Sequence, residues 1–309
     1  MIITITMNPA VDKTITINEF QIDQVNRISD FRLDAAGKGI NVSKVVKELG
    51  GRTKTVAFLG GATGDYIRDQ LGDNKIGLVE VRTAGDTRTN IKVVDPVSKT
   101  YTDINASGAP VTEEQMELFE KKLFNFVTSQ SIVVFTGSVP PGVDKSVYKD
   151  LIHRAQAIGA TAVLDADGDL LKFGVQAGPK VIKPNIHELE GFCGHPLRTD
   201  QEVIEVAKSL LQNGTEMVVV SLGGDGALFV REEDVIKAHG QKVEVKGTVG
   251  AGDAMLAAIC YGLHKALPFE EMIRLAIGTS AAKVTMEGTQ PPNLDKIYRL
   301  TKQVKLENI

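Results

Sequence analysis

Three short apolar runs, each ending at glycine, constrain the fold of this chain more than any other feature. A strand that is apolar on both faces belongs to a sheet covered by helices on both sides, as parallel sheets are. Between these runs lie segments with helical spacing of apolar residues. The alternation predicts an α/β fold, a three-layer α/β/α sandwich with a mainly parallel sheet. The runs are TVAFLG (55–60), IVVFTG (132–137) and MVVVSLG (217–223); further strands are expected at 2–7, 161–165 and 180–182, and helices at 40–49, 144–158, 200–213, 251–266, 269–286 and 293–303.

Two regions break this alternation, because strand-like segments follow one another there without a helix between them. In TRTNIKVV, Arg88, Asn90 and Lys92 fall on one face, while Ile91 and Val93 fall on the other. A small sheet with one polar and one apolar face, inserted into an α/β domain, is suited to cover a site. The segments are TITINEF (14–20), NRISDFRL (26–33), TRTNIKVV (87–94) and YTDIN (101–105). We expect a discontinuous β-sheet lid at 12–34 and 87–105, and an α/β nucleotide- and substrate-binding core at 1–11, 35–86 and 106–309.

Composition excludes several classes of partner. The chain has 309 residues, 42% of them hydrophobic, and a net charge of −4, so no basic field indicates nucleic acid or an anionic membrane surface. The N-terminus lacks a basic region followed by an apolar one, and no apolar run approaches the length of a membrane span. Cys193 and Cys260 have no metal-ligand spacing. A cytoplasmic protein that binds neither nucleic acid nor membrane is expected.

The segment GTVGAGDAML (247–256) places an aspartate among glycines at the start of an apolar helix. Gly250 and Gly252 allow close approach of the backbone to another molecule. A glycine turn that leads into a helix presents free N–H groups and the positive end of the helix dipole, which suit an anion. Asp253 is therefore either a helix cap or a base held beside a site for a second anion.

Two cationic segments also admit two interpretations. In AAGKGIN (35–41), glycines surround Lys38 at a helix start, without the spacing of a Walker A loop. Lys38 either holds an oxyanion or is a solvated lysine in a tight turn. The polar strand face with Arg88 and Lys92 either faces a phosphorylated or carboxylated substrate or is simply solvated.

Three further turns follow predicted strands, where ligands gather in open α/β sheets. TGSVPPG (136–142) is either a ligand loop or a turn built by proline and glycine. In KPNIHE (183–188), Asn185 and Glu188 either hold hydrated Mg²⁺ or form a helix cap. SLGGDGA (221–227) either approaches a nucleotide or forms a plain hairpin turn. The charged run 231–237 is expected to be a solvated loop.

Taken together, these turns resemble the ribokinase-like (phosphofructokinase B) carbohydrate kinases. The likeness extends from Thr4 nearly to the C-terminus, and the pair AAGKGIN and TVGAGD is its most specific part. KPNIHE resembles the N-x-x-E element of that family. The resemblance implies an α/β/α sandwich with a β-sheet lid, phosphoryl transfer from ATP with Mg²⁺ to a sugar hydroxyl, a monovalent cation as a further cofactor, and homodimers formed through the lids.

The resemblance also implies roles for individual residues. Asp253 corresponds to the catalytic base, and the backbone amides of Gly250, Ala251 and Gly252 to the anion hole. Glu188 and Asn185 correspond to metal-binding positions that act through water. The substrate-binding positions are Asp12, Arg27, Gly37, Lys38, Asn41, Arg88, Asn90, Lys92 and Ser138. The ATP-binding positions are Lys183, Asn185, Ser221, Leu222, Gly223, Gly224, Asp225, Gly226, Thr248, Gly252 and Ser280.

Within that family, the resemblance of the segments NIK (90–92) and TDIN (102–105) favours D-fructose 1-phosphate as the substrate, phosphorylated at its 6-hydroxyl to fructose 1,6-bisphosphate. Kinases of the same family that act on tagatose 6-phosphate or fructose 6-phosphate are alternatives, as is a catalytically silent sugar-phosphate sensor. The chain departs from many relatives at Ala36, in the glycine loop, and at Gly247, which precedes Thr248 where they have Asp or Asn. The second departure leaves side-chain capping at this turn in doubt.

Overall fold

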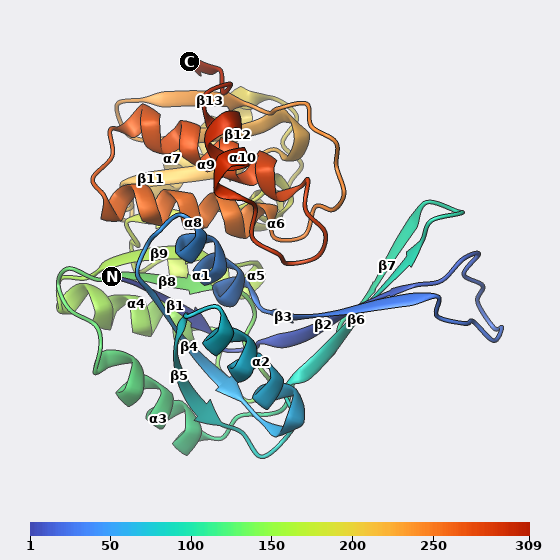
Figure 1. Ribbon diagram of the computed structural model, residues 1–309. Helices are drawn as coiled ribbons and strands as arrows, with labels where there is room; N and C mark the ends of the chain where they lie inside the picture. The colour runs from blue at the N-terminus through green and yellow to red at the C-terminus, as the bar shows by residue number, and fades with distance from the viewer.

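The computed structural model describes residues 1–309 and contains two sheets of unequal size. The small sheet projects away from the side of a larger α/β body (Figure 1). The strands of the large sheet are β1 (Ile2–Thr6), β4 (Thr53–Leu59), β5 (Gly77–Arg82), β8 (Ile132–Thr136), β9 (Thr161–Asp165), β10 (Val181–Ile182), β11 (Met217–Ser221), β12 (Gly226–Val230), β13 (Val235–His239) and β14 (Leu306–Asn308). Those of the small sheet are β2 (Ala10–Thr16), β3 (Asp30–Ala36), β6 (Arg88–Asp95) and β7 (Thr100–Ile104).

The large sheet is parallel over most of its width, as predicted. Its strand order is β14-β13-β12-β11-β10-β9-β8-β1-β4-β5. The pairs from β11 to β5 are all parallel, whereas β12, β13 and β14 add an antiparallel edge. Because the parallel strands run in one direction, the turns that follow β8, β9, β10 and β11 lie along one edge of the sheet.

Helices cover both faces of this sheet, so its central strands are buried on both sides. In β8, Ile132 and Val134 pack into one core with side chains of α1, α8, α9 and α10, while Val133 and Phe135 pack into another with α3, α4, α5 and α7. The helices are α1 (Lys38–Glu48), α2 (Gly61–Asp73), α3 (Glu113–Phe124), α4 (Val147–Ala157), α5 (Gly168–Val175), α6 (Ile186–Cys193), α7 (Asp200–Leu211), α8 (Ala251–His264), α9 (Phe269–Lys283) and α10 (Leu294–Thr301). The predicted α/β/α sandwich is confirmed. No helix is both long and apolar enough to cross a membrane.

The small sheet has the order β3-β2-β6-β7, with β2 and β6 parallel and the other pairs antiparallel. Its register places Asp34, Asp12 and Asn90 next to one another across three strands. Because side chains alternate along a strand, these residues share one face, while Leu33 and Ile91 lie on the other. The sheet therefore has the polar and apolar faces that the sequence predicts. The division of the chain into core and lid residues stays a prediction.

Three local predictions were wrong. The strand expected at 26–33 begins only at Asp30, where pairing with β2 starts. The strand expected at 14–20 ends at Thr16, because Asp95 accepts hydrogen bonds from the N–H groups of Glu19 and Phe20 and fixes a turn there. The charged run 231–237 is not wholly a loop, since β13 begins at Val235 and buries Val235 and Ile236. In each of these places, tertiary contacts override the local pattern.

Candidate active site

The N-terminal turn of α8 presents free backbone donors, as the sequence predicts. Gly250 caps the helix at a φ of 77°, a left-handed conformation that favours glycine. The N–H groups of Gly250, Gly252 and Asp253 have no partner, whereas that of Ala251 donates to Thr248 O at 3.2 Å. Three amides are therefore available to an anion. The amide of Ala251, which was expected in the anion hole, is not among them, because it closes the turn instead.

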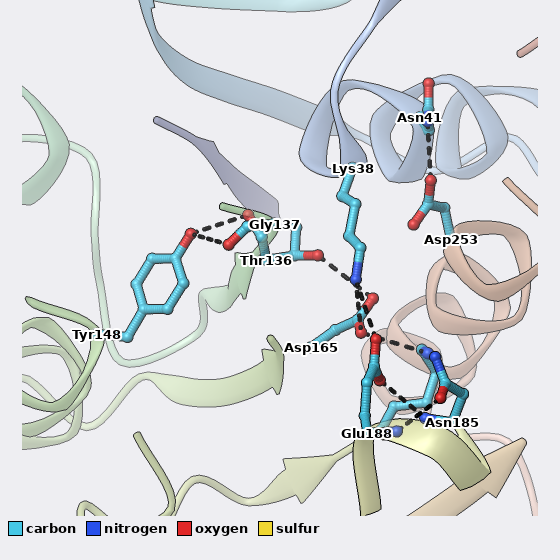
Figure 2. A network of polar contacts seen from close by, with 10 residues as sticks. Lys38, Asn41, Thr136, Gly137, Tyr148, Asp165, Asn185, Glu188 and Asp253 are labelled. Atoms are coloured by element: carbon cyan, nitrogen blue, oxygen red, sulfur yellow. Dashed lines mark hydrogen bonds and ion pairs between the residues drawn. The ribbon is translucent and has the colours of Figure 1, made fainter. Parts of the chain in front are cut away.

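Asp253 does not cap this helix. Its only hydrogen bond is accepted by Oδ2 from Asn41 Nδ2 on α1, at 2.8 Å (Figure 2). Burial raises the pKa of Asp253 to about 6, with a further increase from the charge of Asp165, while Lys38, Asn41 and Lys183 lower it. A carboxylate with a pKa near neutrality and few partners suits a general base. The structure therefore rules out the interpretation of Asp253 as a helix cap and leaves its interpretation as a base.

Asn41 presents a second unused group beside this carboxylate. Its Nδ2 donates to Asp253, but its Oδ1 is buried and has no hydrogen-bond partner. An unsatisfied buried acceptor is costly, by about 1–3 kcal/mol. A hydroxyl donor arriving at this position would satisfy Asn41 Oδ1 next to Asp253.

A buried aspartate at the end of β9 joins two lysines from distant parts of the chain. Asp165 Oδ1 lies 3.4 Å from Lys38 Nζ and 3.4 Å from Lys183 Nζ, and Thr136 donates to its Oδ2 at 3.3 Å. Burial alone would raise the pKa of Asp165, but Lys183 and Lys38 outweigh it and hold the pKa below its usual value. Lys38 is thus not a freely solvated lysine; its ammonium is held between Asp165 and Glu188 (Figure 2).

Asn185 and Glu188 form a reciprocal helix cap at the start of α6. Glu188 Oε2 accepts from Asn185 N, and Asn185 Oδ1 accepts from Glu188 N, both at 2.8 Å. Glu188 Oε1 is not used by the cap and lies 3.7 Å from Lys38 Nζ. No group of three or more His, Cys, Asp or Glu side chains is arranged to hold a metal directly. A Mg²⁺ ion here would keep most of its water or phosphate ligands, as Mg²⁺ usually does, and Glu188 Oε1 fits that mode.

The turn after β11 lies directly beside this cap. Ser221 N donates to Pro184 O at 3.0 Å, and Ser221 and Asn185 form an isolated parallel bridge. Residues Gly223–Asp225 form a short 3₁₀ turn into the antiparallel strand β12, so SLGGDGA is also the hairpin turn that the sequence allowed. A Cβ at Gly252 would lie 3.4 Å from Lys183 Nζ, which brings this edge of the sheet to the start of α8.

A cavity of about 210 Å³ lies between the small sheet and the core. Asn90 Nδ2 donates to Asp12 Oδ1 at 3.0 Å within it, and Lys92 Nζ lies 3.2 Å from Asp103 Oδ1. Burial raises the pKa of Asp12, against the hydrogen bond from Asn90. The lining residues are Asp12, Thr14, Asp34, Asn90, Ile91, Lys92, Asp103, Asn105, Val249, Gly288 and Thr289. Val249 immediately precedes the glycine turn of α8, so the cavity reaches that turn.

The structure places some predicted residues outside this arrangement. Arg27 is exposed in the loop between β2 and β3. Arg88 directs its guanidinium at the carbonyl groups of Asn8, Pro9 and Ala106. Ser138 accepts a hydrogen bond from Asn8 Nδ2 at 3.3 Å, beside the loop after β8.

Gly37 caps α1 at the base of the small sheet, one residue before Lys38. Ser280 lies on α9, where its side chain forms no hydrogen bond with the other predicted residues, and Thr248 is exposed just before the glycine turn.

Sequence reasoning missed several residues that the fold brings to the site. Asp165 ends an apolar strand and had no neighbouring glycine motif to distinguish it. Asp34 and Thr289 line the cavity from β3 and from the loop after α9. Their positions depend on strand register and loop packing, which local sequence does not encode. The position of Asp165 at the end of a predicted parallel strand was the one signal available.

Comparison with known proteins identifies the family. The chain matches the pfkB family of carbohydrate kinases over residues 5–296. It is a pfkB family carbohydrate kinase. It is 33% identical to a 1-phosphofructokinase of Vibrio cholerae over 99% of this chain and 96% of that one. It is 31% identical to a tagatose-6-phosphate kinase of Staphylococcus epidermidis over 99% of each chain. Structures of phosphofructokinase-2 from Escherichia coli, in complexes with potassium and with substrates and products, superpose with a TM-score of 0.93 at 29% identity, over 98% of each chain.

Membership of this family settles the class of reaction. The chain is a phosphotransferase that acts on an alcohol group of a sugar, and kinases of this family use ATP as the co-substrate. The relatives differ in the sugar phosphate that their names state. The geometry described above must therefore carry any inference about substrate and residue roles.

Proposed function

We propose that this kinase transfers the γ-phosphoryl group of ATP to the 6-hydroxyl of D-fructose 1-phosphate, giving fructose 1,6-bisphosphate and ADP. The observation that carries the proposal is the juxtaposition of the buried Asp253 carboxylate with the three free amides at the start of α8. The name of the Vibrio cholerae relative and the segments at 90–92 and 102–105 support the choice of sugar.

Asp253 acts as the general base in this proposal. The sugar hydroxyl gives its proton to the Asp253 carboxylate while the oxygen attacks the γ-phosphorus and the bond to the β–γ bridging oxygen breaks. Asn41 holds the carboxylate in place through Nδ2 and offers its unpaired Oδ1 to a sugar hydroxyl. Because the pKa of Asp253 is about 6, the carboxylate is ionised at neutral pH yet remains a competent proton acceptor.

The free amides of Gly250, Gly252 and Asp253 stabilise charge on the transferring group. Removing one donor of this kind costs about 2.7–4 kcal/mol of transition-state stabilisation in other enzymes. Lys38 and Lys183 add fixed positive charge nearby, and Asp165 holds both. Phosphoryl transfer requires mainly positioning and electrostatic stabilisation, which these groups supply.

Glu188 is the residue that would hold Mg²⁺ through water, with Asn185 orienting it by the cap. Bound Mg²⁺ supplies charge neutralisation on the ATP phosphates. The turn at 221–226, beside Asn185, would carry the nucleotide, and Thr248 and Ser280 extend that surface. A monovalent cation stays a prediction, and a titration of activity with potassium chloride at constant ionic strength tests it.

The cavity under the small sheet is proposed to hold the sugar phosphate. Asp12 and Asn90 present hydrogen-bonding groups for hydroxyls, and Lys92 is the cation that lines the cavity. Three aspartates also line it, so Lys92 alone does not balance the charge around a phosphate. Arg88, at the start of the same strand, is the next cation available once a ligand competes for its carbonyl partners.

We propose that the apolar face of the small sheet pairs with that of a second copy. Phe31, Leu33 and Ile104 are 59%, 39% and 54% exposed there. Such a dimer would shield these side chains and bring the exposed Arg27 of one copy toward the lid of the other. Leu33→Glu is expected to yield a monomer in sedimentation experiments while wild type sediments as a dimer; an unchanged mass in the variant would remove this face from any interface.

A substrate panel tests the proposed activity. ATP consumption is measured with fructose 1-phosphate, fructose 6-phosphate, tagatose 6-phosphate and fructose, with fructose 1-phosphate expected to give the highest kcat/KM. Asp253→Asn is expected to keep the fold and MgATP binding and to lose about 10²–10⁴-fold in kcat. Asp69→Asn, an exposed aspartate on α2, is the matched control. Near-normal kcat in Asp253→Asn would remove Asp253 from the mechanism.

Tagatose 6-phosphate is the second candidate substrate, because a relative with that name matches the chain over its full length. A higher kcat/KM for tagatose 6-phosphate than for fructose 1-phosphate would favour it. If no sugar phosphate is turned over but one binds in calorimetry, the chain is a sugar-phosphate sensor on a kinase fold.

A further inference from the structure

One buried lysine near the start of α8 has no carboxylate partner. Lys283, the last residue of α9, is 2% exposed, and its Nζ donates to Gly288 O at 2.6 Å. No carboxylate oxygen lies within 4.0 Å of it, unlike Lys38 and Lys183, which share Asp165. An isolated buried ammonium is expensive, so a fold that retains one has another use for the charge.

The position of Lys283 indicates that use. Its Cε lies 3.3 Å from the point that a Cβ would occupy on Gly250, and Asp253 Oδ2 lies 3.9 Å from the same point. Lys283 and Asp253 therefore flank the cap residue of α8, next to the three free amides. Helices α8 and α9 pack side by side, which fixes the lysine in this place (Figure 1).

The carbonyl that Lys283 holds belongs to the wall of the sugar cavity. Gly288 and Thr289 both line that cavity. The backbone of Gly288 is pressed against β3, since a Cβ there would lie 2.3 Å from Asp34 Oδ2. Lys283 thus connects the turn after α9, which touches the small sheet, with the amides that receive the phosphoryl group.

We propose that Lys283 is a positioning residue for phosphoryl transfer. Its ammonium fixes the turn at 286–289 against the start of α8 and supplies the unpaired positive charge that an anion at Gly250–Asp253 requires. The proposal rests on the function proposed above, since it concerns the γ-phosphoryl group bound at those amides.

Charged groups around Lys283 set the pH range in which it acts. Burial lowers the pKa of Lys283 to about 8; Asp34 and Asp253 oppose this, while Lys44 and Arg32 add to it. The ammonium is thus present below about pH 8 and is lost as pH rises through that value. A phosphoryl group bound beside it would extend the charged range upward.

Two variants separate the charge of Lys283 from its hydrogen bond. Lys283→Gln keeps a donor for Gly288 O without the charge, and Lys283→Met removes both. The control is Lys122→Met, which removes a lysine that donates to Glu80 O at 2.7 Å on the far edge of the sheet. Measured are kcat, its pH profile, the melting temperature, and the dissociation constants of MgATP and MgADP.

Both Lys283 variants are expected to lose on the order of 10–100-fold in kcat and to lose the alkaline decline above pH 8 that wild type shows. Their affinity for MgATP should fall more than that for MgADP, because only ATP places a phosphate at the amides. The melting temperature of Lys283→Gln should stay the same or rise, since a neutral group that can still donate to Gly288 O replaces an unpaired buried charge. Lys122→Met should match wild type in kcat and in the ratio of the two affinities.

Wild-type kcat and an unchanged MgATP-to-MgADP ratio in Lys283→Gln would overturn the role of the charge. If Lys283→Met does not fold, Lys283→Gln alone decides, by the same two readouts. The proposed function fails separately, when wild type itself neither turns over a sugar phosphate nor binds MgATP. If wild type and the Lys283 variants are equally active, only the role of Lys283 is contradicted and the proposed function stands.

Discussion

Replacement of Asn41 by leucine is expected to move the acidic limb of the pH–activity profile. Asn41 Nδ2 is the only hydrogen-bond donor to Asp253 and lowers its pKa against the effect of burial. A hydrogen bond to a charged group contributes about 1.5–3 kcal/mol. One pKa unit corresponds to about 1.36 kcal/mol, so losing this bond should raise the pKa of Asp253 by about 1–2 units. The midpoint should therefore move from about 6 to about 7–8.

The sign follows from the role of the group. A base must be ionised, so activity is retained above its pKa and lost as pH falls through it. The assay is kcat and kcat/KM for fructose 1-phosphate from pH 5 to pH 9 at constant ionic strength. Loss of a contact between Asn41 and the sugar would lower activity equally at every pH, whereas a raised pKa of Asp253 would move the midpoint of the profile. At pH 6.5 the ionised fraction should fall about 3-fold to 25-fold beyond any loss that is uniform across pH.

The control for this experiment is Ser43→Ala. Ser43 lies on the same helix, is fully buried, and contacts Thr4 and Thr53 rather than the site. Its profile should keep a midpoint near 6. A midpoint near 6 in Asn41→Leu as well would refute the reasoning. The acidic limb would then report the pKa of a group other than Asp253, or the hydrogen bond from Asn41 would not affect the pKa of Asp253.

Lys92→Met should lower kcat/KM for sugar phosphates by about tenfold or more, with a smaller effect on an unphosphorylated sugar. Lys13→Met, on the neighbouring strand β2 and on the opposite face of the sheet, should change neither. Equal losses for both kinds of sugar would show that Lys92 does not contact the phosphate. Asp165→Asn should lower the free energy of unfolding by about 3–5 kcal/mol in urea titrations, because it leaves two lysines without their shared carboxylate. Since the pKa of Asp165 lies below its usual 3.8, wild type should lose this contribution as pH falls below that value, and the variant should lack that acid-dependent step.

The sequence alone predicted the layers and the two sheets because their signals are local. Short apolar runs that end at glycine are typical of strands in a covered sheet, and glycines beside Asp253 and Lys38 mark turns that lead into helices. Period-two alternation placed Asn90 and Lys92 on one face of the small sheet, and the register confirms it. Where a turn was fixed by a distant side chain, as at Asp95, the local pattern failed.

Only the tertiary structure decided what the ambiguous residues do. A helix cap and a general base look alike in sequence. In the structure, Asp253 makes no hydrogen bond to the backbone of its own helix and accepts one from Asn41 on α1 instead, which distinguishes the two. Asp165 became a site residue only when parallel strands brought it between Lys38 and Lys183, which are 145 positions apart in the chain. Lys283 belongs to none of the sequence motifs. That it is buried without a carboxylate partner can be seen only in the packing of α9 beside α8. Local periodicity fixes which face of an element is buried, whereas charge pairing and desolvation depend on which elements meet.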